Sequence, residues 1–530
     1  MLRILLFLLM GIVWAQNKID MPYDFSRHQG YIIRDGNILW NDDWFAGHFF
    51  FDGTFENYPS TFGPYIESKY FADKLDSSSI DSNQTSSYFD WIQGDYYLDN
   101  LDIGVKYLKG SRRGFLHGFK KRYAGAYNQY TVGSSAPSPI RYTYLGTYQS
   151  KTENNTIDFS VGNFNSNFGL LDSSGTSYID SRITSSNLKY RFDYDSLIIT
   201  LNAHNFLQRY NSLYSESLNN HVRYLTRTKL LTTINFMKYK GYDLSIVADI
   251  NKRSLRSKAF TSVSWNSLKI SMANSSHLLS AGIINLINNN YFIVDGNVNY
   301  NFGRFNFKSS FSHNYFPSHT SIYKATSNEQ KNQLTINTNW TNNRLILGAS
   351  IYVNSFKRED EPIPDQYLLP KEGSNIWFSG FLEYEFIHDN RFSISYDKIN
   401  SNNYITDGIE DRVKFKLENQ FKLFSGSMLV QSSISLSGFL NRYSDYVLHP
   451  IEKHPVRIES ESLSQDKWLA DFIISCRVKS LQIKYEMNNL SNVIYDYLGD
   501  SNKDYNIQFN PYYPEMRRLA SLSIYWKFLD

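Results

Sequence analysis

The sequence predicts an all-β protein, one large antiparallel transmembrane β-barrel of about 22 strands (range ~16–24). Three observations predict this class. Apolar and polar residues alternate along most of the chain, aromatic residues make up 16% of it, and short polar turns are interspersed with long polar loops. The 530 residues have a mean hydropathy of −0.44, and no stretch after the N-terminus approaches the ~20 apolar residues of a spanning helix. This excludes a polytopic helical membrane protein.

The first residues have the build of a secretory signal. A short positive start at Arg3 precedes the apolar run Ile4–Val13, and small residues precede Gln16 at the spacing of a cleavage site. We therefore predict that residues 1–15 are a signal peptide. The alternative is an uncleaved anchor, for which the apolar run is about half as long as needed.

Strict alternation marks the strands. In residues 413–423, Val413, Phe415 and Leu417 share one parity, while Lys414, Lys416 and Glu418 share the other. Successive side chains of a strand point to opposite faces, so this segment has one apolar and one hydrated face. The same pattern recurs in residues 188–195, 344–353, 481–488 and 520–528.

The connections are of two kinds. Short polar turns are expected at Lys240-Gly241, Asn342-Asn343, Asp389-Asn390 and Ser425-Gly426. Long polar loops are expected at residues 172–186, 357–373, 443–465 and 491–516. Outer-membrane barrels have short turns on the periplasmic side and long loops outside. Helical periodicity is hard to find, so the sequence predicts no substantial helix.

A secreted β-sandwich or propeller also alternates, with its apolar face inside. The runs here are longer than the ~5–6 residues usual for sandwich strands. Aromatic residues also gather at the ends of runs, for example Tyr142, Tyr144 and Tyr148, where the interfacial girdle of a membrane barrel would lie. The barrel is therefore preferred, with the cell outer membrane as its location.

The end of the chain carries a resemblance to a known family. Leu522, Ile524, Trp526 and Phe528 share the apolar parity of the last strand, and residues 485–492 and 510–518 lead into it. This resembles the C-terminal hairpin of TonB-dependent receptor barrels. The resemblance implies that these four residues form the signal by which the barrel-assembly machinery inserts the protein.

The resemblance also draws attention to a plug domain, which this chain is expected to lack. TonB-dependent receptors carry an N-terminal plug domain, but here amphipathic runs begin at residues 31–40 and 45–56, which leaves too little chain for a separate domain. Residues 16–530 are therefore expected to form a single barrel without a plug, similar to the plugless putative porins of Bacteroidetes type. The N-terminal residues would form the first strands or fold into the lumen.

If the apolar face meets lipid, the charged face lines the lumen. The candidate lumen residues are Lys189, Arg191, Asp193, Lys414, Lys416, Glu418 and Lys422. Rings of charged side chains set the ion preference of pores, and this mixed, slightly cationic set indicates a weak preference for anions. The alternative is that these residues only hydrate the wall and pair across strands.

Other functions find less support. The net charge of +3 argues against a nucleic-acid partner, and the single Cys476 excludes a disulfide framework. Neither Gly-x-Ser-x-Gly nor His-Glu-x-x-His occurs, so we expect no enzyme, no catalytic or metal-ligating residues and no cofactor. The basic segment 109–122 could bind lipopolysaccharide phosphates or anionic solutes, although such runs are usually solvated loops. His449 and His454 flank a carboxylate, but a polar loop is preferred over a metal site.

The prediction is a porin-like channel for passive or facilitated passage of small solutes. Its surroundings would be outer-membrane lipid and lipopolysaccharide. Two alternatives remain. One is a TonB-dependent receptor-like barrel that works with a separate plug or surface lipoprotein, and the other is a structural or adhesive barrel that uses its long loops.

Overall fold

The structure is a computed structural model of the whole chain. It describes residues 84–122, 124, 140–169, 178–195, 197–213, 221–256, 260–319, 326–359, 371–387, 389–403, 409–442, 466–497 and 517–529, and the short ranges 18–20, 31–34, 37–40, 446–448 and 455–457. All structural statements below concern these residues.

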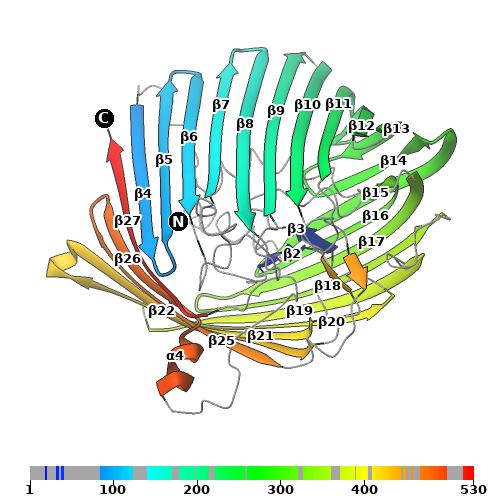
Figure 1. Cartoon of the computed structure of the whole chain (residues 1–530). Coiled ribbons are helices and arrows are strands. Elements are labelled where there is room, and N and C mark those ends of the chain that lie inside the picture. Colours follow the sequence, from blue (N-terminus) through cyan, green and yellow to red (C-terminus); the bar gives the residue numbers. More distant parts are fainter. Residues whose placement is uncertain are drawn as a thin grey trace.

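Twenty-two antiparallel strands form one closed barrel, which confirms the predicted fold class (Figure 1). The strands run in chain order around the barrel. They are β4 (Gln84–Gly94), β5 (Leu98–Lys109), β6 (Arg112–Arg122), β7 (Ile140–Lys151), β8 (Asn155–Gly169), β9 (Tyr178–Tyr194), β10 (Leu197–Leu213), β11 (His221–Tyr239), β12 (Tyr242–Arg256), β13 (Phe260–Ala273), β14 (His277–Leu286), β15 (Asn289–Phe302), β16 (Phe305–His319), β17 (Thr326–Thr341), β18 (Leu345–Arg358), β19 (Glu372–Ile387), β20 (Asn390–Asn402), β21 (Ile409–Leu423), β22 (Met428–Arg442), β25 (Lys467–Val478), β26 (Leu481–Asn488) and β27 (Leu519–Leu529).

The last strand closes the barrel on the first. β27 pairs with β4 from Ser521 opposite Gly94 to Leu529 opposite Ser86. Closure leaves no open sheet edge, and this is the way in which strands satisfy their backbone groups in a bilayer.

Along most strands one face is largely apolar and exposed, and the other is largely polar. The long-loop part of β13–β15 departs from this pattern, because Val263, Trp265, Ile284, Leu286 and Ile293 form a buried apolar cluster on the inner face. In β5, Leu101, Ile103 and Val105 are exposed, whereas the alternate residues Asn100 and Asp102 are buried. This is the reverse of a soluble sandwich, in which the apolar face is buried. Most apolar residues of the strands therefore point outward, and most polar residues point into the barrel.

The two rims of the barrel differ. At one rim, which we call the short-turn rim, every connection between strands spans two to four residues, and both β4 begins and β27 ends there. At the other, the long-loop rim, connections reach 30 residues. All four predicted short turns lie at the short-turn rim. Lys240 and Gly241 both have positive φ, 48° and 83°, as the type I′ turn of a two-residue hairpin requires.

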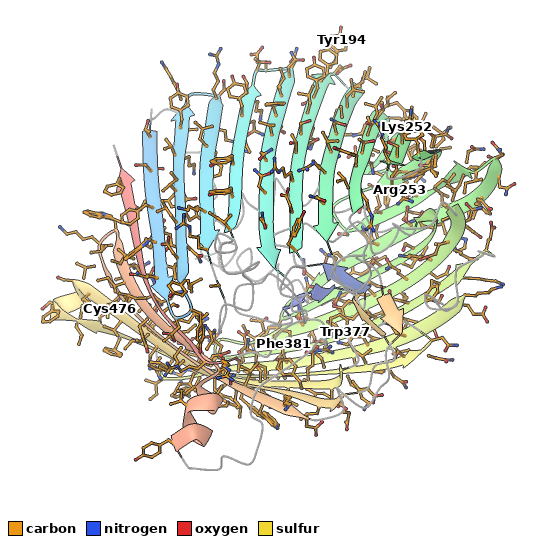
Figure 2. All side chains as sticks on the ribbon, in the orientation of Figure 1. Tyr194, Lys252, Arg253, Trp377, Phe381 and Cys476 are labelled. Carbon is orange, nitrogen blue, oxygen red and sulfur yellow. The ribbon has the colours of Figure 1, made fainter. Side chains whose placement is uncertain are left out.

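Outward-facing aromatic residues gather at the short-turn rim. Tyr194, Tyr239 and Phe302 are 64%, 55% and 64% exposed and lie at the ends of β9, β11 and β15 (Figure 2 labels Tyr194). Trp526 and Phe528 stack there, with ring centroids 4.7 Å apart. Such a girdle marks a membrane–water boundary.

Several sequence-based boundaries were wrong. The loop expected at residues 172–186 is shorter, because β9 already begins at Tyr178. The long connection after β26 contains a helix, α4 (Leu490–Tyr497), and a 3-10 turn, η6 (Phe424–Gly426), follows β21. The basic segment 109–122 is not a loop: its last eleven residues are strand β6.

The N-terminal strands do not join the barrel. β1 (Lys18–Asp20), β2 (Tyr31–Arg34) and β3 (Asn37–Trp40) pair with one another in a separate sheet, and Figure 1 shows β2 and β3 within the outline of the barrel. The barrel begins only at Gln84, so the premise that residues 31–40 belong to barrel strands is wrong. Residues 45–56 lie outside the described ranges. β23 (Tyr446–Leu448) and β24 (Pro455–Arg457) form a further two-stranded sheet.

Candidate functional site

The inner wall of the barrel holds the candidate site, because many of its side chains are polar and bond to one another. On β13–β16, Lys269 Nζ lies 2.5 Å from Asp295 Oδ2. Ser280 Oγ donates to the same carboxylate at 3.2 Å, and Asn314 Nδ2 donates to its other oxygen at 2.8 Å. Opposite charges that are only partly exposed stabilise the wall and fix the positions of their strands.

A second inward group lies on β17–β20 (Figure 2 labels Trp377). The Trp377 indole donates to Asp397 Oδ1 at 3.2 Å, and its ring lies 4.9 Å from that of Tyr352. Asn354 donates to Asn375 at 2.9 Å. Trp377 and Tyr352 are the largest fully buried side chains among the described residues.

Burial of the inner wall changes from one rim to the other. Toward the long-loop rim, Trp377, Asn251 and Arg412 are only 0%, 1% and 4% exposed. Toward the short-turn rim, the side chains of Arg191 and Glu418 are 46% and 43% exposed. Ser245 and Ser280, small inward residues near the short-turn rim, are also buried, at 8% and 7% exposed. The two halves therefore differ at these large side chains, which neighbouring groups cover in the long-loop half and solvent reaches in the short-turn half.

The seven predicted lumen residues lie on the faces of β9 and β21 opposite to the exposed apolar side chains. Arg191 Nε donates to Asp193 at 2.8 Å, and Lys416 Nζ lies 2.5 Å from Glu418. Both pairs are formed within one strand, two residues apart. The remaining three residues, Lys189, Lys414 and Lys422, are exposed on the same two faces. The structure places the β9 and β21 sets on strands far apart around the barrel, so they form two patches (Figure 1).

The residues of the predicted insertion signal all lie on the outward face of β27. Leu522, Trp526 and Phe528 are 43%, 42% and 37% exposed, and Ile524 lies between them on the same parity. Cys476 is a free thiol on the outward face of β25, opposite Val430 (Figure 2). It points away from the polar inner wall.

The histidines that were weighed as a metal site lie in the connection between β22 and β25. His449 and His454 fall between β23 and β24, outside the described ranges. Within those ranges, no three His, Cys, Asp or Glu side chains are grouped as a metal ion would need. Nor does any described helix have the length and apolar character to cross a membrane.

The sequence analysis missed the inward ion pairs between strands, because they depend on the exact register of neighbouring strands. A two-residue turn mirrors the residues on either side of it, so positions equally far from Lys240-Gly241 lie close together. The mirror of Lys229 is Lys252, but a bulge between Asn235 and Met237 shifts the register, so Lys229 lies opposite Asn251. Its charged atom lies 3.2 Å from that of Asp249, two residues nearer the turn on β12. The mirror rule alone therefore does not find this pair.

Comparison with solved structures identifies the architecture. The FrpB iron transporter of Neisseria meningitidis (F5-1 variant) aligns over 86% of this chain and 84% of its own, with a TM-score of 0.64 and 10% identity. The ferric enterobactin receptor PfeA of Pseudomonas aeruginosa aligns over 84% and 82%, with a TM-score of 0.60 and 11% identity. This chain has the fold of these receptors.

FpvA of Pseudomonas aeruginosa, solved bound to heterologous pyoverdines, aligns over a larger part of the chain. The alignment covers 97% of this chain and 83% of FpvA, with a TM-score of 0.62 and 11% identity. No protein-family model matches the sequence, and no curated protein matches it.

Proposed function

We propose that the chain is an outer-membrane uptake barrel of the TonB-dependent receptor type, which works with a separate partner or plug, rather than a permanently open porin. The observation that carries the proposal is the closed 22-strand barrel, whose fold is that of solved iron and siderophore receptors. The burial of large inward side chains such as Trp377 and Asn251 adds support, because porins keep a polar, water-filled interior.

In this proposal the long-loop rim faces the outside and the short-turn rim faces the periplasm, as in bacterial outer-membrane barrels. A small solute binds from the outside and passes only when the partner acts on the barrel. Residues 1–15 direct export and are removed. The barrel-assembly machinery recognises the last strand through Leu522, Ile524, Trp526 and Phe528. The protein moves solutes and performs no covalent chemistry.

The segment before the first barrel strand is long enough to form a separate unit. The barrel begins at Gln84, so 68 residues lie between the predicted cleavage site and the first barrel strand. Domains begin at about 50 residues, so this length leaves room for a separate unit. The absence of a plug domain remains a prediction.

Planar-bilayer conductance of the purified, folded, full-length protein tests the proposal. We expect few or no stable open steps, because in this proposal the solute passes only with the partner. Folding is checked independently by heat-modifiable migration in gel electrophoresis. A folded protein with long-lived open steps and a steady conductance would contradict the proposal.

The second candidate is the porin-like channel, and it is favoured by the hydrated, charged wall near the short-turn rim. Its seven lining residues would then set ion selectivity. If open steps are found, replacing Lys414, Lys416 and Lys422 by Gln should shift the reversal potential toward cation preference under a salt gradient. Replacing Lys252, which lies on the outward face, is the matched control and should leave the reversal potential unchanged.

A further inference from the structure

The outward face of β8–β13 becomes polar and cationic toward the long-loop rim. On β12, the outward residues Ile246 and Ile250 are apolar and exposed, but the next outward positions along the strand include Lys252 and Arg256, both exposed. On β9 and β10 the corresponding positions include Arg182 and Arg209. Asn, Thr and Ser occupy most outward positions between these cations.

The register places three arginines in one row across the strands. Arg182 lies opposite Arg209, Arg209 lies opposite Tyr224, and Tyr224 lies opposite Arg256. We call Asp180, Arg182, Arg209, Lys252 and Arg256 the outer cationic belt. Like charges directly opposite each other on neighbouring strands are unfavourable unless an anion lies near both of them.

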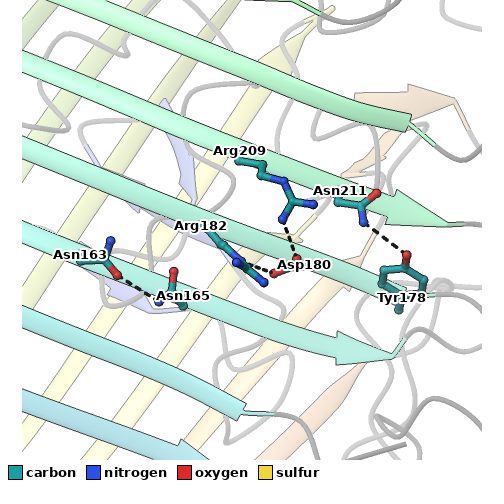
Figure 3. A network of polar contacts seen from close by, with 7 residues as sticks. All are labelled: Asn163, Asn165, Tyr178, Asp180, Arg182, Arg209 and Asn211. Carbon is teal, nitrogen blue, oxygen red and sulfur yellow. Dashed lines mark hydrogen bonds and ion pairs between the residues drawn. The ribbon is translucent and has the colours of Figure 1, made fainter.

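A single carboxylate serves two of the cations (Figure 3). Asp180 accepts from Arg182 Nε at 3.4 Å and from Arg209 Nη1 at 3.1 Å. The Arg182 side chain is nevertheless 61% exposed. The belt has four cations and one anion, so its net charge is +3, and among the described residues no ion pair holds Lys252 or Arg256.

Uncharged polar side chains around the belt also point outward and bond to one another. Asn165 donates to Asn163 at 3.0 Å, and Asn211 donates to the Tyr178 hydroxyl at 3.3 Å (Figure 3). Asn163 in turn donates to Thr184 at 3.1 Å. Such a surface offers both donors and acceptors to hydroxyl groups. It suits a sugar as well as an anion.

The distance of the belt from the apolar band determines which lipid headgroups can reach it. Lys252 is the first outward residue after Ile250, so it lies at the edge of the apolar band. Arg256 lies four residues further, about 13 Å along the strand and about 10 Å along the membrane normal for a tilt of ~40°. The headgroup layer of an ordinary phospholipid extends only about 5–8 Å beyond the hydrocarbon. The arginine row therefore lies beyond the reach of a phospholipid phosphate.

We propose that the outer cationic belt binds the phosphorylated saccharide headgroup of a glycolipid of the outer leaflet, of lipopolysaccharide type. Lys252 binds a phosphate near the acyl chains, and the arginine row binds acidic groups on sugars further out. Arginine forms bidentate contacts with phosphate and carboxylate, which suits this row. The belt goes beyond the proposed function, because it concerns the outer wall and not the solute path.

The opposite side of the barrel provides a matched control. On the outward face of β20–β22, Lys398 pairs with Asp411 at 3.4 Å, and Tyr396 and Asn441 donate to the same carboxylate at 2.5 Å. Here one cation is neutralised by one anion, and Asp411 is only 5% exposed. This pair should add little to the binding of an anionic glycolipid.

The test is lipid binding to the full-length protein, measured by native mass spectrometry with purified lipopolysaccharide and with phosphatidylglycerol as separate probes. The main variant is R182Q/R256Q, which keeps the Arg209–Asp180 pair and so preserves the fold. It should weaken lipopolysaccharide binding about 10-fold or more. It should leave phosphatidylglycerol binding unchanged. K398Q should bind both lipids as the wild type does.

Three outcomes would overturn the proposal. The first is wild-type lipopolysaccharide affinity in R182Q/R256Q, and the second is an equal loss in K398Q. The third is displacement of the lipid by 10 mM-scale inorganic phosphate, which would indicate a small-anion site. If R182Q/R256Q migrates as an unfolded protein, the single variant R256Q, whose side chain is exposed, replaces it with the same criteria.

Discussion

The depth at which the outward face of β13 changes character gives a direct test of how the barrel sits in a membrane. Ile270 is 65% exposed on this face, opposite Ile246 of β12 and Ala281 of β14. Ser264 is exposed on the same face of the same strand, opposite Lys252. Replacing each by Arg introduces the same charge at two depths.

The expected loss in the free energy of unfolding follows from the depth of each residue in the membrane. The two residues are six positions apart, or about 20 Å along the strand, and about 15 Å along the membrane normal for a tilt of ~40°. The apolar band of such barrels is about 25 Å tall, so Ser264 lies beyond it if Ile270 lies near its centre. Arg at the midplane costs about 2–4 kcal/mol and near the interface about 0–1 kcal/mol. A difference of about 2–3 kcal/mol is a 30- to 150-fold change in the folding equilibrium.

Urea unfolding and refolding in lipid vesicles measures both variants, with the folded fraction read from heat-modifiable migration. We expect Ile270→Arg to lower the free energy of unfolding clearly and Ser264→Arg to leave it within about 1 kcal/mol of the wild type. Equal costs for the two variants would show that the outward face of β13 does not cross a bilayer at this depth. A larger cost for Ser264→Arg would reverse the assigned position of the membrane.

Two further predictions concern the packing of neighbouring strands. A Cβ on Gly282 would lie 2.1 Å from the carbonyl oxygen of Leu268, so Gly282→Ala should lower the free energy of unfolding by about 1–3 kcal/mol in the same assay. The control is Gly380→Ala, which should be neutral because the nearest atom to its Cβ would be 3.9 Å away. Equal effects of the two variants would contradict the close approach of β13 and β14. Lys269→Met should cost about 1–2 kcal/mol, because the Asp295 carboxylate loses its cation. A double-mutant cycle with Asp295→Asn measures the coupling, and a coupling energy near zero would show that the pair does not hold the wall.

The alternation of a strand was predictable because it is a local property. Residues 413–423 lie in β21, and residues 481–488 coincide with β26. The same local pattern misled at residues 31–40, which form β2 and β3 but pair with each other and with β1. Alternation defines the faces of a strand, whereas its partner depends on backbone groups elsewhere in the chain. The helix α4 was missed because eight residues carry too little periodicity.

The sequence by itself determined that the chain forms a barrel of about this size and which side chains share a face, because the two-residue period of a strand is written in consecutive residues. The tertiary structure alone decided which inward side chains are buried and that Arg256 lies in one row with Arg182 and Arg209. Arg182 and Arg209 are mirror positions across the two-residue turn between β9 and β10, but the place of Arg256 depends on the register of β10 with β11, which seven residues connect, and on the bulge between Asn235 and Met237. Burial of Trp377 likewise depends on Tyr352 and Asp397, which neighbouring strands bring beside it.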